Sequence, residues 1–400
     1  MRLTEFRRAG HTPSLLAALL HFDVSFMVWV MLGALGAYVG EDLGLSAAGK
    51  GLLVAVPLLS AAVFRVTFGL LVDRYGPRRV GTASMVVVIV PLVWAWLGAS
   101  TYGELLGVGL LLGVAGASFA ISLPLASRWY PPRYQGVAMG IAGAGNSGTV
   151  ITVLVAPRLA ESLGWHAVFG LATIPVAVVA LAFVLLAREP PAAPSRLTLA
   201  SLRAVLAEGD LWRLCGFYAV TFGGFVGLAS FLPVFFHDEY GLSKVDAASL
   251  TAVGAGAGSL LRPLGGCLAD RIGGTAVLTV AYAATSVLLL TAATLPPLAV
   301  AAVAFPLTMA VLGVGNGATF QLVGLRFGQR IGAVTGLVGA AGGLGGFFLP
   351  TVLGTLKDLA GSYAAGLAVL GAAALLALGA IALVRTGWRA GWARVAEARV

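Results

Sequence analysis

The stretch RVTFGLLVDRYGPRR, residues 65–79, decides the fold of this chain. Its first residue, Arg65, lies in an otherwise apolar run, eight residues before the next charged residue, Asp73. A guanidinium at the depth of a lipid bilayer costs ~2.5–3.5 kcal/mol on insertion scales. Because that cost must be offset by some gain, the position of Arg65 predicts a role for its charge.

The composition around this stretch is that of a membrane protein. Of the 400 residues, 59% are hydrophobic and only 10% are charged, and the mean hydropathy is +0.97. A soluble domain carries about 25% charged residues. Apolar stretches longer than about 18 residues recur along the whole chain, and each can span ~30 Å of hydrocarbon. The sequence therefore predicts an all-α polytopic membrane protein.

The apolar runs predict twelve membrane-spanning helices. The segment 188–211 is proline-rich at its start and then amphipathic, and it separates an N-terminal six-helix bundle (1–187) from a C-terminal one (212–400) with a short basic tail. The expected helices are approximately 15–39, 46–71, 80–99, 104–127, 134–157, 165–187, 212–236, 246–269, 275–295, 298–324, 331–355 and 364–386.

The two halves repeat each other. At an offset of 197 residues, Arg65-x3-Gly69-x3-Asp73-Arg74-x-Gly76 recurs as Arg262-x3-Gly266-x3-Asp270-Arg271-x-Gly273. GVAGASF (113–119) is likewise echoed by GVGNGATF (313–320), with one insertion. Transporters built from two parallel six-helix halves show this kind of symmetry, with the binding site between the halves near the midplane.

The net charge of +9 reports topology rather than nucleic-acid binding. Nineteen of the 25 Lys and Arg residues lie in one set of loops and tails, four lie in the alternate loops, and Arg65 and Arg262 lie within helices. This asymmetry predicts a multi-pass protein of the cell (inner) membrane with both termini and the linker in the cytoplasm. Two cysteines and four scattered histidines predict no disulfide framework, metal or cofactor.

The two intramembrane arginines are the candidate binding residues. Each precedes its aspartate by eight residues, which places it roughly 12 Å deeper in the membrane. Pseudo-symmetry then predicts that the guanidiniums face each other across the cavity. Of 16 acidic residues only Asp23 falls in the interior of a predicted helix, the others lying at helix ends or in loops and tails, so the expected counter-charge is a transported planar oxyanion held in bidentate fashion. The alternative is that each arginine bonds backbone carbonyls or polar side chains structurally.

Two glycine-dense runs add a second repeated feature. They are GIAGAGNSGT (140–149) and GLVGAAGGLGG (336–346). Close helix packing explains most of these glycines. Asn146 is the polar residue that we expect to donate to an oxyanion, and interhelical hydrogen bonding is the alternative role for its amide.

These motifs resemble two known groups of proteins. GLLVDRYGPRR (69–79) is similar to the signature loop of the major facilitator superfamily. The paired arginines together with AGAGNSG (142–148) and GAAGGLGG (339–346) resemble the nitrate/nitrite porter family of that superfamily. FDVSFMVWVMLGALG (22–36) and FYAVTFGGFVG (217–227) look like the family's first and seventh helices.

The resemblance implies a major facilitator fold and a nitrate or nitrite site between the arginines. The substrate-binding positions that it implies, together with those expected from the residues themselves, are Arg65, Arg262, Asn146, Tyr218, Phe119, Phe222, Phe320, Gly145, Gly342 and Gly343. The gating or structural motif comprises Gly69, Asp73, Arg74, Gly76, Asp270 and Arg271, with Asp73 placed to cap or salt-bridge a neighbouring helix end.

Several functional hypotheses remain open at this point. Nitrate/nitrite exchange is favoured, because two positive charges without an anion between them would be costly to occlude. Nitrate–proton symport is the competing mechanism, with Asp23 as its candidate titratable group. The same fold carrying formate or a carboxylate is a further alternative. The sequence shows no nucleophile–base pair and no attached sensory domain, so we expect a monomeric transporter rather than an enzyme or a sensor.

Overall fold

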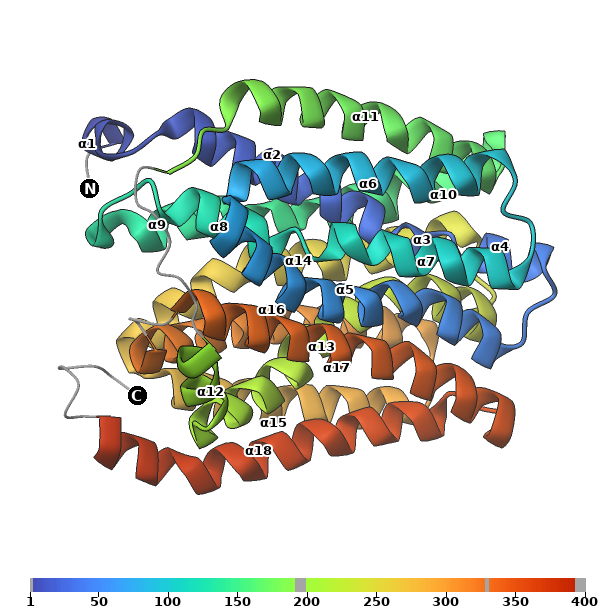
Figure 1. Cartoon of the computed structure of the whole chain (residues 1–400). Helices are drawn as coiled ribbons and strands as arrows, with labels where there is room; N and C mark the ends of the chain where they lie inside the picture. Colours follow the sequence, from blue (N-terminus) through green and yellow to red (C-terminus); the bar gives the residue numbers. More distant parts are fainter. Residues whose placement is uncertain (1–2, 191–198, 328–330, 393–400) are drawn as a thin grey trace.

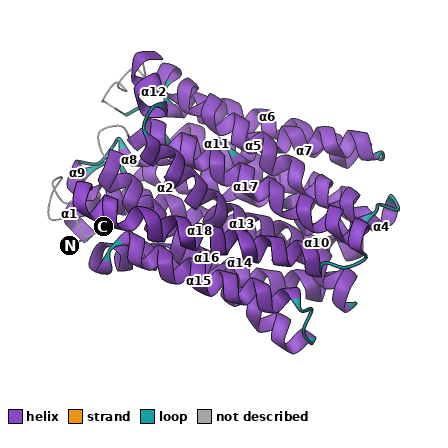
Figure 2. Ribbon diagram, turned by 90° about the horizontal axis from the view of Figure 1, so that it is seen from below, coloured by secondary structure: helices purple, strands orange, loops and turns teal. Residues whose placement is uncertain are grey.

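The chain folds into a bundle of long helices that run side by side, as the computed structural model shows (Figures 1 and 2). The structure describes residues 3–190, 199–327 and 331–392, and these contain no strand. The N- and C-terminal ends and α12 lie at one end of the bundle in Figure 1. We call this the terminal end, and the opposite end, where α4 lies, the distal end.

The first half contains the helices that precede residue 190. Their bounds are α1 Leu3–Ala9, α2 Thr12–Trp29, α3 Met31–Ala34, α4 Gly36–Asp42, α5 Ala47–Tyr75, α6 Pro77–Leu97, α7 Tyr102–Gly116, α8 Phe119–Ser127, α9 Pro132–Gly143, a 3₁₀ turn at Ala144–Ser147, α10 Gly148–Leu163 and α11 Trp165–Leu186.

The second half begins after the linker, whose residues 191–198 lie outside the described part of the chain. Its helices are α12 Leu199–Leu206, α13 Gly209–Tyr240, α14 Lys244–Ile272, α15 Gly274–Ala293, α16 Leu298–Phe327, α17 Ile331–Ala360 and α18 Ala364–Trp392.

Three of the expected helices are interrupted, so their prediction as continuous segments is wrong. The first breaks at Val30 and Leu35, where the backbone leaves helical dihedral angles. The segment expected at 104–127 breaks between α7 and α8, and the one at 134–157 tightens into the 3₁₀ turn. That turn lies in the glycine run, where helix propensity is low. Hydropathy alone does not report such local breaks.

In the described part of the chain, eleven helical segments are long and apolar enough to cross a membrane. The one expected span that is not among them is the eighth, 246–269, which forms α14; this helix is long enough but differs from the others in composition. Its 29 residues include a site arginine and several other charges, namely Lys244, Asp246, Arg262, Asp270 and Arg271. α14 packs against α16 of its own half and α10 of the other half. Arg262 is half-buried between them, whereas Asp246, Asp270 and Arg271 are exposed near the ends of the helix.

The outer helices carry the surface expected to face lipid. α6 and α11 lie on one side of the bundle and α15 and α18 on the other (Figure 1). They expose large apolar side chains such as Val90, Leu185, Val280 and Leu383. An exposed apolar surface of this extent is unfavourable in water and suits a hydrocarbon environment.

The two halves meet along two main helix pairs, α5 with α17 and α10 with α14. Close approach of the backbones requires small residues at these interfaces. A Cβ atom at Gly51 of α5 would lie 2.5 Å from the carbonyl oxygen of Pro350 on α17. The site arginines lie on α5 and α14, so each belongs to a helix at the boundary between the halves.

Candidate binding site between the two halves

Arg65 is buried at this boundary, with 1% of its surface exposed. Its Nε donates a hydrogen bond of 3.0 Å to the carbonyl oxygen of Gly116, in its own half. Its Nη1 donates one of 2.5 Å to the carbonyl oxygen of Gly339, in the other half. Its Nη2 is buried and has no partner in the described part of the chain. Arg65 thus makes the backbone bonds expected of a structural arginine, and both N–H groups of its Nη2 remain free.

The carbonyl oxygen of Gly116 is available because the helix breaks there. In a continuous helix it would accept from the N–H of Ala120. That N–H donates instead to Ala117, at 2.9 Å. The break between α7 and α8 therefore turns a backbone acceptor toward Arg65.

Arg262 enters the same region from α14. Its Nη2 donates a hydrogen bond of 3.3 Å to the hydroxyl of Tyr218, on α13. The ring of Tyr218 stacks on Phe222 at a centroid distance of 5.0 Å and meets Phe320 edge-on at 5.0 Å. Tyr218 therefore links Arg262 to the aromatic residues of the site.

Both guanidiniums lie over the same two aromatic rings. The Cζ atoms of Arg65 and Arg262 are each 5.9 Å from the centroid of Phe119, and 5.1 and 6.0 Å, respectively, from that of Phe222. Trp29 flanks Arg65 at 5.2 Å, and Phe320 flanks Arg262 at 5.5 Å. We call Trp29, Phe119, Tyr218, Phe222 and Phe320 the aromatic cage.

The cage stabilises the two charges without neutralising them. Cation–π contacts contribute roughly 0.5–2 kcal/mol each and leave the guanidinium charged. No ion pair joins Arg65 or Arg262 to a carboxylate of the described residues. Apolar walls lower the local dielectric, which strengthens any hydrogen bond made to an anion there. The site is thus a positively charged region with apolar walls, which suits a small oxyanion.

Asn146 lies at the boundary between the halves, where its amide nitrogen already donates one hydrogen bond to a side chain of the other half. Its Nδ2 donates a hydrogen bond of 2.8 Å to the hydroxyl of Ser259, which is three residues before Arg262 on α14. Its Oδ1 is buried without a partner among the described residues. In this conformation Asn146 therefore connects the 3₁₀ turn before α10 to α14.

The expected glycines allow close packing around the cage. A Cβ atom at Gly342 would lie 2.7 Å from the ring of Tyr218, and one at Gly343 would lie 3.0 Å from Ala62 of α5. A Cβ atom at Gly145 would lie 2.8 Å from the backbone of Asp23 on α2. Gly342 thus supports the cage, whereas Gly343 and Gly145 permit close contact between helices.

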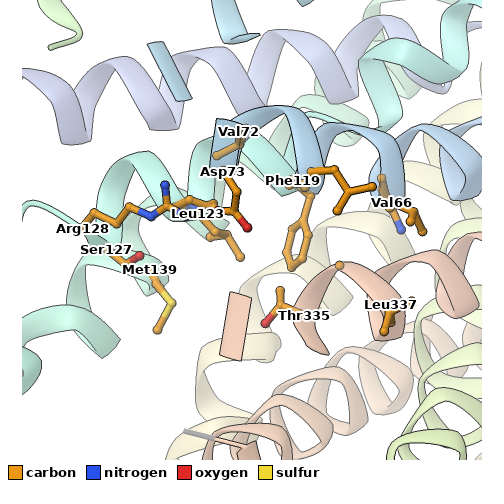
Figure 3. A pocket seen from close by; sticks show the side chains of 16 residues that line it. Val66, Val72, Asp73, Phe119, Leu123, Ser127, Arg128, Met139, Thr335 and Leu337 are labelled. Carbon is orange, nitrogen blue, oxygen red and sulfur yellow. Dashed lines mark hydrogen bonds and ion pairs between the residues drawn. The ribbon is translucent and has the colours of Figure 1, made fainter. Parts of the chain in front are cut away.

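A pocket of about 790 Å³, its open mouth included, extends from Arg65 toward the terminal end. Phe119 of α8 and Thr335 of α17 face it from opposite halves, and Asp73 and Arg128 face each other at the end remote from Val66 (Figure 3). Two ion pairs at the terminal end, Asp73 with Arg128 and Arg326 with Asp210, each lie within one half. The terminal end is therefore the side from which this conformation can be entered.

The distal end is closed by polar contacts that join the halves. Lys50 pairs with Asp238 at 2.8 Å. Glu41 pairs with Lys244 and, at 3.1 Å, with His237. Asp358 accepts hydrogen bonds from the first backbone N–H groups of α5, at Ala47 and Ala48. We call these contacts the distal latch.

The repeated loop motif has a structural role that the geometry explains. Asp73 forms an ion pair of 2.6 Å with Arg128 at the end of α8, in keeping with its expected place beside a neighbouring helix end. Gly76 and Gly273 follow α5 and α14 with φ of 87° and 94°, a backbone conformation that favours glycine.

The remaining motif positions lie near the ends of α5 and α14. The guanidinium of Arg74 lies 5.2 Å from the ring of Tyr75, and Gly69 lines the pocket. Asp270 and Arg271 occupy the corresponding end of α14.

Asp23 is separate from the two arginines. Its carboxylate accepts a hydrogen bond of 2.6 Å from the hydroxyl of Ser147, in the 3₁₀ turn. No ion pair joins it to a described cation. Asp23 therefore connects α2 to the glycine run, whose backbone lies beside it.

Sequence reasoning missed four contributors to the site: Trp29, Ser259 and the carbonyl oxygens of Gly116 and Gly339. The two carbonyls become acceptors through a helix break and through contact between the halves, neither of which the residue types indicate. Trp29 lies within the first-helix stretch already singled out, but nothing in its spacing relates it to Arg65.

The fold and the site define a polytopic membrane carrier with two homologous halves. The Major Facilitator Superfamily description matches residues 17–350, and the chain belongs to that superfamily, a family of transporters rather than enzymes. Within it, the chain belongs to the nitrate/nitrite porter family. The expected fold class and family resemblance are thereby confirmed.

Three relatives illustrate the family. The probable nitrate/nitrite transporter NarK2 of Mycobacterium tuberculosis (strain H37Rv) is 38% identical and covers 91% of this chain and 94% of its own length. The nitrite extrusion protein of Bacillus subtilis is 34% identical, with 88% and 89% covered. The probable nitrate/nitrite antiporter NarK1 of Thermus thermophilus is 34% identical, with 83% and 82% covered.

A solved structure shares the fold. A bacterial homolog of the human lysosomal transporter Spinster superposes with a TM-score of 0.69 at 21% identity, covering 93% of this chain and 96% of the other. At this identity the likeness concerns the fold alone.

Proposed function

We propose that this protein carries nitrate and nitrite across the membrane by alternating access, with the anion held between Arg65 and Arg262. One observation carries the proposal: the two guanidiniums, from opposite halves, lie over the rings of Phe119 and Phe222 with no carboxylate partner among the described residues. The unpaired Nη2 of Arg65 is a donor for which an oxyanion is the matching acceptor.

The charge balance favours exchange. Nitrate and nitrite each bring one negative charge to a site that has two positive charges. Without an anion, reorientation would occlude both guanidiniums uncompensated, and desolvation costs several kcal/mol per ion. An anion between them lowers that barrier, so the loaded carrier reorients faster than the empty one. Uptake of one anion is then coupled to release of another.

The distribution of basic residues supports a cytoplasmic location for both termini. Nineteen of the 25 Lys and Arg residues lie in one set of the loops and tails expected from the sequence, the set to which Arg128 and Arg326 of the terminal end belong. With that orientation, the pocket beside Arg65 opens toward the cytoplasm and the distal latch closes the outer face.

Nitrate–proton symport is the second mechanism, and one observation favours it. Asp23 is an acid within α2 that is held by Ser147 rather than by a cation, which leaves it able to take up a proton. The variant Asp23→Asn distinguishes the two mechanisms. Loss of acid-driven uptake with exchange intact supports symport, whereas wild-type behaviour in both assays assigns Asp23 a structural role.

The experiment that tests the function is nitrate uptake into proteoliposomes of the purified full-length protein. Uptake is measured with and without internal nitrite, at two pH gradients, and with formate as a competitor. Exchange predicts uptake that requires internal nitrite and is insensitive to the pH gradient. Uptake of labelled formate in the same proteoliposomes, without uptake of nitrate, would assign the fold to a different small anion.

A further inference from the structure

One face of α16 is directed at the site between its contacts with two neighbouring helices. Gly313 and Gly317 pack on the backbone of α14, where added Cβ atoms would lie 2.1 Å from carbonyl oxygens of that helix. Gly315 packs on the other side, against Thr221 of α13, where a Cβ atom would lie 2.8 Å away. The face between these contacts points toward the space enclosed by α13 and α14.

Phe320 and Asn316 occupy that face. Residues four apart on a helix point in nearly the same direction, with an axial separation of about 6 Å. Phe320 belongs to the aromatic cage, with its ring against Arg262 and Tyr218. Asn316 is therefore directed toward the same space, one turn closer to the distal end, and at the level where Gly317 meets the backbone of Arg262.

Asn316 is a buried residue whose side chain makes no hydrogen bond to another described residue. Only 2% of the residue is exposed, and its Oδ1 has no hydrogen-bond partner in the described part of the chain. A buried polar atom without a partner is destabilising, and such atoms in folded proteins call for a specific explanation. Because Oδ1 can only accept, an anion beside this side chain would be bound by the two N–H groups of Nδ2.

The corresponding segment of the first half is built differently. GVAGASF (113–119) has one residue fewer than GVGNGATF (313–320) and no amide. There the helix breaks and turns the carbonyl oxygen of Gly116 toward Arg65. α16 is continuous through the equivalent turns. The first half thus supplies an acceptor for its own arginine, whereas the second half supplies a side-chain donor.

We propose that Asn316 is a third ligand of the transported anion and favours nitrate over nitrite. The inference rests on the proposed function. Two guanidinium forks bind oxygens in pairs, which suits both anions. Nitrate has a third oxygen in the same plane that nitrite lacks. The Nδ2 group of Asn316, located beside the cage on the side of Arg262, donates to that oxygen.

The test is direct binding of nitrate and of nitrite to purified full-length protein by calorimetry, with thermal unfolding as a parallel readout. Asn316→Leu keeps the volume and removes the donor. We expect its nitrate affinity to fall about tenfold, the loss of one hydrogen bond to a charged group, and its nitrite affinity to change by less than about twofold. Asn316→Ala is the second variant, used if the leucine variant fails to fold. It should change the ratio of nitrate to nitrite affinities by the same factor.

The matched control is Thr285→Val. Thr285, on α15, also has a buried hydroxyl without a partner in the described chain, and it lies outside the cage. Its replacement should leave both affinities at the wild-type level. An unchanged affinity ratio in the Asn316 variants, with a raised unfolding temperature alone, overturns the inference and leaves the proposed function intact. A wild-type protein that binds neither anion overturns both.

Discussion

The Nη1 atom of Arg65, on α5, donates to the carbonyl oxygen of Gly339, on α17, so that an arginine of one half is hydrogen-bonded to the backbone of the other. An oxyanion held in bidentate fashion needs two adjacent donors of one guanidinium. Nε has a single N–H, so an anion that binds Nε and Nη2 must replace Gly116 as an acceptor; Nη1 has a second N–H, so one that binds Nη1 and Nη2 either shares Nη1 with Gly339 or replaces it. Where it replaces Gly339, binding removes a bond between the halves.

The arginines are the first target for mutation. Arg65→Lys and Arg262→Lys keep the positive charge and lose the fork, so we expect nitrate uptake to fall about 100-fold in each, as two charge-assisted hydrogen bonds become one weaker contact. Uptake into proteoliposomes measures this. Arg213→Lys is the control, because Arg213 is exposed and a lysine can retain its ion pair with Asp210. Wild-type uptake in both single variants would refute the paired-arginine site.

Gly342 tests the support of the aromatic cage. Gly342→Ala adds a Cβ atom 2.7 Å from the ring of Tyr218, which must shift away from Arg262. Overpacking of this kind costs about 1–3 kcal/mol, so nitrate affinity should fall by about tenfold or more. Gly140→Ala is the control in the other glycine run, because a Cβ atom there meets nothing within 4 Å. Equal nitrate affinities in the two variants would contradict the role of Gly342.

The distal latch is tested through its most buried ion pair. The side chains of Lys50 and Asp238 are 13% and 19% exposed. Lys50→Ala leaves Asp238 unpaired and should shift the population toward the form open at the distal end by roughly 5–30-fold, or about 1–2 kcal/mol. Distances between spin labels on the two halves report the shift. The double variant Lys50→Asp with Asp238→Lys exchanges the two charges and should restore the wild-type distances. If the distances in the double variant stay at the values of Lys50→Ala, packing rather than charge closes this end.

Acid should weaken the same latch through Glu41. This residue lies at the end of α4 with 55% of its side chain exposed, and it faces Lys244 and His237. The hydrogen bond from Lys244 holds the pKa of Glu41 below its usual value of 4.5. A lowered pKa means that the contact stabilises the closed form above pH 4.5 and is lost as the pH falls through the shifted pKa.

The measurement is the distance between spin labels across the distal end, followed as the pH is lowered from 7 to about 3. Glu41→Gln should remove the change in the acid range. An identical pH profile in the wild type and this variant would exclude Glu41 as its source.

More of the fold than of the site could be predicted from the sequence. The apolar runs predicted the helices, and the 197-residue offset alone related Arg65 to Arg262. The aromatic residues Phe119, Tyr218, Phe222 and Phe320 were expected together and lie together. Their role in binding an anion stays a prediction. The helix breaks were missed because hydropathy averages over the residues on either side of them.

The amino-acid sequence by itself predicted the membrane spans, the division into two related halves and the depth of both arginines, because these predictions follow from local composition and from spacing along one helix. Only the tertiary structure decided which donors have partners. Arg65 meets Gly339, Asn146 meets Ser259 and Asn316 meets no described partner because of how helices more than 100 residues apart in sequence pack together. A hydrogen bond depends on the position of its acceptor to within a few tenths of an ångström, and no pattern of residue types specifies that position.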